Sequence, residues 1–116
     1  MKSLSKASAF IFILFSTFIF AQQKTETAKV YGNCSMCEAR IEKAATTQDG
    51  VKASWDAKSK TLSMTYDAAK TNKKEILKRV AEVGHDNEAF LASEKVYDNL
   101  PGCCQYDRPK TITKDK

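Results

Sequence analysis

The sequence predicts an α+β fold in which two helices cover one face of a four-stranded antiparallel sheet, in the order β-α-β-β-α-β. Three observations support this fold class. Residues 51–55 and 62–66 alternate between apolar and polar side chains, as the two strands of a hairpin do. Apolar residues recur at helical spacing in residues 37–45 and 76–83, one segment before the hairpin and one after it. Short segments at residues 26–31 and 88–92, each interpreted as a strand, complete the order.

The first strand is expected at residues 26–31, where Ala28 and Val30 alternate with polar neighbours. A helix is expected next, over residues 37–45, because four apolar residues share one helical face: Cys37, Ile41, Ala44 and Ala45. A turn signal, Gln48-Asp49-Gly50, separates this helix from the hairpin. The two hairpin strands are joined by polar residues 56–60.

The second helix has a start signal and an end signal. Asn72 and Glu75 have the spacing of an N-cap and its partner three residues later, and Gly84 ends the helix. Residues 88–92 are expected to form a fourth strand, which gives the split βαβ or ferredoxin-like arrangement. Since the first and fourth strands of this arrangement are antiparallel, residues 93–102 would have to lead the chain back along the sheet to reach the first loop.

Residues 1–21 have the pattern of a secretory signal peptide. Lys2 and Lys6 precede a 15-residue uncharged run that is too short to span a bilayer as a helix. An uncleaved N-terminal anchor is the alternative. Cleavage would release an exported protein with no stable membrane insertion; the periplasm as its compartment is implied only together with the family resemblance described below.

The mature chain is expected to be one domain, residues 22–92, followed by a C-terminal extension, residues 93–116, that ends in a frayed tail. Loss of two lysines with the signal lowers the net charge from +5 to +3, and basic and acidic residues are interleaved along the chain. This charge pattern argues against nucleic acid as a partner.

Cys34 and Cys37 are separated by two residues, in the segment GNCSMCEARIE. Such a pair can be a redox couple, half of a zinc site, one disulfide or a two-thiolate clamp for a soft ion. The predicted fold places Cys34 in the loop after the first strand and Cys37 at the start of the first helix. Backbone N–H groups and the helix dipole stabilise thiolates there, which should lower the thiol pKa. Two thiolates in a loop suit a soft ion of low coordination number better than tetrahedral zinc.

Residues 25–92 resemble the heavy-metal-associated domain, the fold of copper chaperones, of the N-terminal modules of copper-pumping ATPases and of the periplasmic mercury-binding protein. The resemblance rests on Gly32, Cys34, Cys37, the helix segment ARIE at 39–42, Gly50-Val51 and the segment VAEVGH at 80–85. It implies that Cys34 and Cys37 are the metal ligands. It also implies that the protein binds one Cu(I) or a comparable soft ion and passes it to a partner by thiolate exchange.

The chain departs from the family pattern around these cysteines. Gly32 stands where the family has a methionine, and Met36 lies between the cysteines instead, so we expect Met36 either to replace the lost apolar packing or to bind copper itself. His85 lies in the loop that the family places beside the metal, which makes it a candidate ligand or a residue that tunes the site. The alternative for His85 is an ordinary surface or structural residue.

Cys103 and Cys104 lie in the extension, after a Pro-Gly turn signal. Adjacent cysteines rarely bond to each other, because the geometry is strained. They are interpreted as extra soft-metal ligands, as disulfide partners of Cys34 or Cys37, or as partners for another molecule. In reduced protein we expect at least one of them to approach the CxxC pair, with Tyr97, Leu100 and Tyr106 as apolar anchors for the extension.

The sequence therefore predicts a non-enzymatic, exported metallochaperone or scavenger. Cu(I) is the expected ion, with Hg(II), Ag(I) and Zn(II) as alternatives. A metal-transport ATPase, an efflux component or another acceptor protein would be its partner, and the chain would be a monomer or a metal-bridged dimer. The competing functions are a thiol–disulfide oxidoreductase and a disulfide-bonded structural adaptor. The oxidoreductase fits less well, because such proteins place a proline loop opposite the sulfurs and both prolines here lie in the extension.

Overall fold

The computed structural model describes residues 22–48 and 50–109, so the predicted signal peptide and the tail beyond residue 109 lie outside the described residues. The elements in chain order are β1 (Gln23–Lys29), α1 (Ser35–Ala45), β2 (Lys52–Asp56), β3 (Thr61–Asp67), α2 (Lys73–Glu82), α3 (Glu94–Asp98) and the 3-10 helix η1 (Gly102–Cys104).

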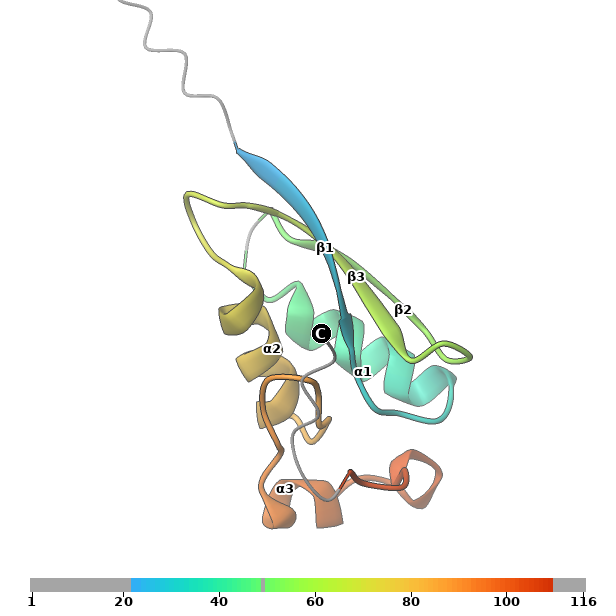
Figure 1. The fold of residues 1–116 in the computed structure, drawn as a ribbon. Coiled ribbons are helices and arrows are strands. Elements are labelled where there is room, and N and C mark those ends of the chain that lie inside the picture. Colours follow the sequence, from blue (N-terminus) through green and yellow to red (C-terminus); the bar gives the residue numbers. More distant parts are fainter. Residues whose placement is uncertain (1–21, 49, 110–116) are drawn as a thin grey trace, which may run out of the picture.

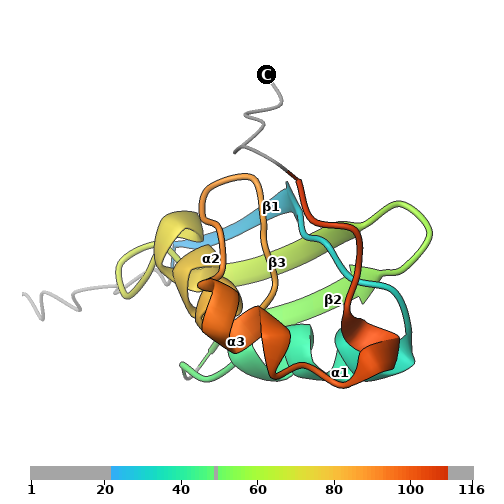
Figure 2. The ribbon, with the colours of Figure 1, turned by 90° about the horizontal axis from the view of Figure 1, so that it is seen from below.

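The sheet has the antiparallel order β1-β3-β2, and α1 and α2 pack on one of its faces (Figures 1 and 2). The predicted hairpin is confirmed, with Trp55 of β2 paired with Leu62 of β3. The core lies between the sheet and the helices. Its fully buried side chains include Ile41, Leu62, Met64, Ile76 and Leu77, which come from the predicted helical and strand faces.

The local signals of α2 act as the sequence predicts. The side chain of Asn72 accepts a hydrogen bond from the backbone N–H of Glu75, and so satisfies a donor that the first helical turn leaves free. Gly84 follows the helix with a φ of +109°, a conformation that glycine adopts without strain. The chain then turns back toward the end of β1.

The predicted fourth strand is wrong. Among the described residues the sheet has three strands, and the segment after α2 contributes only an isolated bridge between Asn87 and Val30. The side-chain oxygen of Asn87 accepts hydrogen bonds from the N–H groups of Ala89 and Phe90, at 3.0 and 2.9 Å. This Asx-type turn uses donors that a strand would offer to its neighbour, so residues 88–92 do not form the expected strand.

The extension is ordered beyond what its sequence pattern indicated. It forms α3 and η1, which lie below the ends of α1 and α2 in Figure 1, at the end of the molecule that holds the β1–α1 loop. Leu100, Cys104 and Tyr106 join the buried core, which confirms Leu100 and Tyr106 as anchors, and Tyr97 packs against them half-buried. Because a fourth strand does not form, the chain never leaves this end and needs no return path along the sheet.

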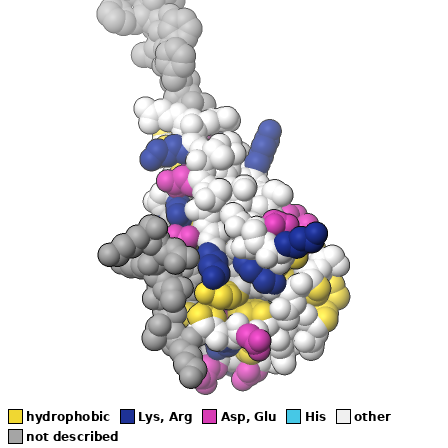
Figure 3. Space-filling model, turned by 45° about the vertical axis from the view of Figure 1, so that its right-hand side comes forward, with side chains coloured by type: hydrophobic (Ala, Val, Ile, Leu, Met, Phe, Trp, Pro, Cys, Tyr) yellow, Lys and Arg dark blue, Asp and Glu magenta, His cyan; other side chains and the backbone are white. Residues whose placement is uncertain are grey.

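The surface mixes charges of both signs. On the face drawn in Figure 3, basic and acidic side chains are interspersed, as the sequence predicts. Within residues 22–48 and 50–109, no helix combines the length and apolar character that crossing a membrane requires.

Candidate metal centre

The first two cysteines occupy the start of α1. Cys34 is the N-cap residue and is half-buried, and Cys37 lies in the first turn with its side chain fully buried. Their Sγ atoms are 3.8 Å apart, and both are free thiols. This arrangement places both sulfurs next to the unpaired N–H groups of a helix N-terminus, where negative charge is stabilised.

Gly32 allows close packing under this loop. A Cβ atom at Gly32 would lie 3.0 Å from the Trp55 ring and 3.1 Å from Cβ of Cys37. Trp55 is buried, and its indole N–H donates to the Val30 carbonyl at 3.0 Å. Trp55 thus fills the space beside Gly32, and Met36, which is 52% exposed, does not supply the apolar packing that was one of the two expectations for it.

The two thiols differ in acidity. The N–H of Cys37 stabilises the Cys34 thiolate and is the main reason why the pKa of Cys34 is lowered to about 7. Burial raises the pKa of Cys37 to about 11. The expectation of a lowered pKa at the helix start is thus confirmed for Cys34 and wrong for Cys37, because desolvation exceeds the stabilisation that nearby donors give to the buried sulfur.

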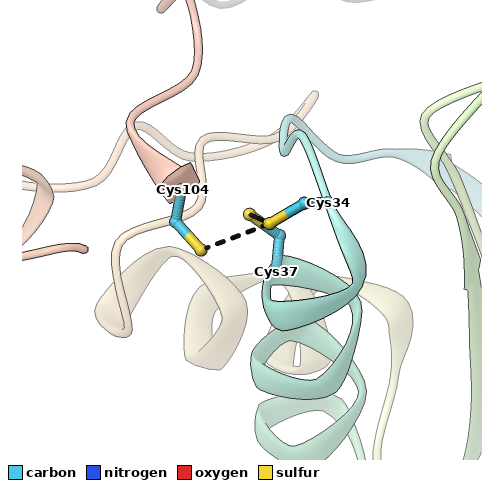
Figure 4. A group of neighbouring side chains, drawn as sticks. All are labelled: Cys34, Cys37 and Cys104. Atoms are coloured by element: carbon cyan, nitrogen blue, oxygen red, sulfur yellow. Dashed lines mark hydrogen bonds between the residues drawn. The ribbon is translucent and has the colours of Figure 1, made fainter. Parts of the chain in front are cut away.

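Cys104 brings a third sulfur to the pair. The Sγ atoms of Cys34, Cys37 and Cys104 all lie within 4.8 Å of one another, and Cys34 is 3.9 Å from Cys104. Figure 4 shows the three side chains pointing toward a common centre, two from the start of α1 and one from η1. If each sulfur lay about 2.3 Å from an ion in their plane, as in a zinc thiolate, the sulfurs would be about 4.0 Å apart. The sulfur triad therefore has nearly the spacing of a three-coordinate thiolate site.

The position of Cys104 depends on polar contacts just after it. The Tyr106 hydroxyl donates to the Gly84 carbonyl and accepts from the Asp86 N–H, both at 2.7 Å. Arg108 donates to both carboxylate oxygens of Asp86, at 2.8 and 2.9 Å, and to the Ala92 carbonyl. Asp86 is fully buried, so these bonds satisfy a charge that would otherwise be costly. They fasten the extension to the loop after α2 and hold η1 against α1.

His85 is buried rather than on the surface. Its Nδ1 lies 2.8 Å from the Tyr31 carbonyl, and its ring stacks on Tyr106 with centroids 5.5 Å apart. Burial lowers the pKa of His85, so the ring is neutral at pH 7. Its Nε2 has no hydrogen-bond partner among the described residues. His85 is not part of the sulfur triad but supports Tyr106, two residues beyond Cys104.

Cys103 and Met36 lie at the rim. The Sγ of Cys103 is exposed and lies 3.5 Å from the Met36 Sδ and 3.9 Å from the Cys104 Sγ. The structure thus brings together every sulfur that the sequence singled out, although Cys103 lies outside the triad.

Sequence reasoning missed Asp86 and Arg108. A faint signal for them exists: an acidic residue follows Gly84-His85, where a helix has just ended, and Arg108 is the one arginine in the 93–116 segment. Nothing in the local pattern says that these two residues meet, because their contact depends on how the extension folds back.

The fold and site define a class of small α+β domains that present a CxxC pair between the first strand and the first helix. Residues 33–86 match the family model of the heavy-metal-associated domain, and the chain belongs to that family. The match ends before the extension, so Cys104 lies outside it. No curated protein matches the chain.

Three solved structures support the assignment. A CopZ metallochaperone is 26% identical, with a TM-score of 0.53 over 55% of this chain and 98% of that one. Oxidised MerP from Ralstonia metallidurans CH34 is 30% identical, with a TM-score of 0.52, and the match covers 56% of this chain and 93% of MerP. The copper form of a single-residue variant of CopA from Bacillus subtilis is 28% identical, with a TM-score of 0.50, and the match covers 64% of this chain and 96% of the CopA chain.

Proposed function

We propose that this protein carries a soft metal ion, in the first place Cu(I), in a site formed by Cys34, Cys37 and Cys104, and passes it to an acceptor by thiolate exchange. The observation that carries the proposal is the convergence of three free sulfurs within 4.8 Å at the start of α1. Soft thiolate ligands select Cu(I) over hard ions. Similarity to the copper form of a CopA variant agrees with copper, and similarity to a CopZ metallochaperone agrees with a carrier. Hg(II) stays an alternative because it is also a soft ion that thiolates bind.

Zinc fits the site less well. Structural zinc takes four tetrahedral ligands, and the fourth cysteine, Cys103, approaches Cys104 but does not belong to the group of sulfurs that all lie within 4.8 Å of one another. The ring of His85 is engaged by Tyr31 and Tyr106 instead of entering the group. A three-sulfur site is the arrangement that Cu(I) and Hg(II) accept and that zinc does not favour.

The different pKa values of the Cys34 and Cys37 thiols suit the transfer of a metal ion to an acceptor. Cys34 is half-buried, and its lowered pKa makes a thiolate available near neutral pH, so of the two CxxC sulfurs it exchanges more readily with an acceptor thiolate. Cys37 binds by releasing its proton, because the ion stabilises a thiolate that burial alone disfavours. Exchange proceeds as an acceptor thiolate replaces one protein sulfur at a time.

The cellular setting follows from the sequence. Residues 1–21 support export, and the mature residues 22–116 would then work in the periplasm as the 22–92 domain with its docked extension. The acceptor would be a metal-transport ATPase, an efflux component or a similar thiol-bearing protein. The protein performs no chemical conversion in this role.

One observation favours a second candidate, thiol–disulfide exchange. A half-exposed Cys34 with a pKa near 7 beside a buried Cys37 is also how a redox couple presents its attacking and resolving thiols. Counting free thiols in freshly isolated protein separates the two functions. A carrier has reduced cysteines that added Cu(I) protects from alkylation, and a redox couple is isolated partly as a Cys34–Cys37 disulfide.

The proposal is tested by Cu(I) titration against a competing chelator. The Cys34→Ser/Cys37→Ser protein should lose tight binding and keep its circular dichroism spectrum. Ser35→Ala, between the two cysteines, is the matched control and should bind as the wild type does. Unchanged affinity in the double variant would overturn the assignment.

A further inference from the structure

A single ion bound by Cys34, Cys37 and Cys104 leaves two features of the site unexplained. Met36 is one of two large apolar side chains that are strongly exposed among the described residues, and its thioether lies against a thiol rather than in the core. Cys103 is exposed and lies outside the triad, yet its Sγ is within 3.9 Å of the Cys104 Sγ. Both sulfurs therefore face the outer side of Cys104.

The five sulfurs form a continuous series. Successive distances are 3.8 Å from Cys37 to Cys34, 3.9 Å from Cys34 to Cys104, 3.9 Å from Cys104 to Cys103, and 3.5 Å from Cys103 to Met36. Two sulfurs that share an ion at about 2.3 Å each are at most about 4.6 Å apart. Every step of the series is short enough for a shared ion, and Cys104 lies where an inner and an outer set meet.

We propose that Met36, Cys103 and Cys104 form a second, outer site for a monovalent soft ion, and that the Cys104 thiolate bridges it to the inner ion. This inference rests on the proposed function, since it uses the inner site that Cys34, Cys37 and Cys104 provide. Thiolates can bind two Cu(I) ions at once because sulfur has several lone pairs, and thioethers also prefer soft ions. Each cysteine that is still a thiol releases its proton to solvent as it binds, Cys34 is already partly a thiolate near pH 7, and Met36 releases no proton.

The ligand types give the two sites different tasks. The inner ion is held by three thiolates, two of them buried. The outer ion has two thiolates and a neutral thioether, and Cys103 and Met36 are both exposed, so it is held more weakly and exchanges faster. An ion arriving from solvent would meet the outer site first and pass inward across Cys104.

The test is the Cu(I) stoichiometry of the reduced protein, measured by native mass spectrometry during titration, which also reports the oligomeric state. The wild-type monomer should take up two ions in succession. Cys103→Ser and Met36→Leu should each lose the second ion and keep the first at wild-type affinity. Leu91→Ala is the control, since Leu91 is the other strongly exposed large apolar residue and has no sulfur.

Each alternative outcome has a distinct meaning. One ion in the wild-type monomer, or a second ion that appears only in a dimer, would overturn the outer site and leave the proposed function standing. Two ions retained in both variants would also overturn it, because the second ion would then lie elsewhere. If the wild type bound no ion tightly, the proposed function itself would fail.

Discussion

Arg108 donates two hydrogen bonds to the fully buried carboxylate of Asp86, at 2.8 and 2.9 Å. The pair joins the extension to the loop after α2, only four residues beyond Cys104. The third sulfur of the site is therefore held in place by an ion pair that belongs to neither the CxxC segment nor α1.

Replacing Arg108 by Met should destabilise the protein and weaken the metal site together. Removing one partner of a buried pair leaves an uncompensated charge, which typically costs about 3–5 kcal/mol, and the lower end is expected because the Arg108 side chain is partly exposed. Urea unfolding gives the stability, and Cu(I) competition gives the affinity. Lys58→Met removes an exposed charge and should change neither quantity by much. Unaltered Cu(I) affinity in a destabilised Arg108→Met protein would show that the pair does not position Cys104.

Replacing Tyr106 by Phe should cost about 1–3 kcal/mol of unfolding free energy, because the Gly84 carbonyl and the Asp86 N–H would lose their buried partner. The stack on His85 survives, since the ring is kept. Tyr66→Phe is the matched control, because the Tyr66 ring is equally buried. The Tyr66 hydroxyl donates to the more exposed Glu26, so removing this hydroxyl should lower the unfolding free energy less than removing that of Tyr106. Equal losses in the two variants in urea unfolding would contradict the anchoring role of the Tyr106 hydroxyl.

The acidity of Cys34 should appear in its reactivity. Because the N–H of Cys37 lowers the pKa of Cys34 to about 7, alkylation of the metal-free protein by iodoacetamide should reach half its maximal rate near pH 7. Ordinary thiols react at half-maximal rate near about pH 8.5. Mass spectrometry of peptides identifies the modified residue, and Cys37 should react slowly throughout because it is buried. A Cys34 midpoint above about pH 8 would contradict the helix N-terminus argument.

Neutral His85 should make the protein less stable in mild acid. Burial lowers the pKa of His85 in the folded protein, so below about pH 6.5, its ordinary value, the unfolded chain binds a proton that the folded chain does not. Stability should therefore fall as the pH is lowered from about 7.5 to about 5.5, measured as the urea midpoint. The comparison is best made between Cys34→Ser and Cys34→Ser/His85→Gln, since the Cys34 thiol also titrates near pH 7. An equal fall in both proteins would assign the effect to other groups.

Local patterns in the sequence were enough to predict several of the elements and the CxxC pair. The hairpin, both main helices, the Asn72 cap and the Gly84 end depend on neighbours in sequence, and each was predicted. The predicted fourth strand was wrong because the Asn87 side chain accepts hydrogen bonds from the N–H groups of Ala89 and Phe90, which the apolar character of residues 89–92 does not reveal. The expected low pKa of Cys37 was wrong because the cost of burying its thiolate exceeds the stabilisation by nearby donors, and the size of that cost depends on tertiary packing.

The sequence predicts that Cys104 can approach the CxxC pair because the extension is long enough. It does not predict the contacts that hold Cys104 there. Apolar anchors were visible in the sequence, but the Asp86–Arg108 pair and the Tyr106 hydroxyl bonds join residues 20 to 22 positions apart, across a segment that sequence reasoning had assigned to a strand. Contacts of that kind depend on tertiary structure, so they cannot be predicted from the local spacing of apolar and polar residues.

The central claim, a three-sulfur site completed by Cys104, is tested most directly by copper K-edge X-ray absorption at one equivalent of Cu(I), on the wild type and on Cys104→Ser. The account predicts three sulfur neighbours in the wild type and two in the variant, with Cu(I) affinity reduced at least about tenfold, which corresponds to about 1.4 kcal/mol. Two sulfur neighbours in both proteins, with equal affinity, would contradict it.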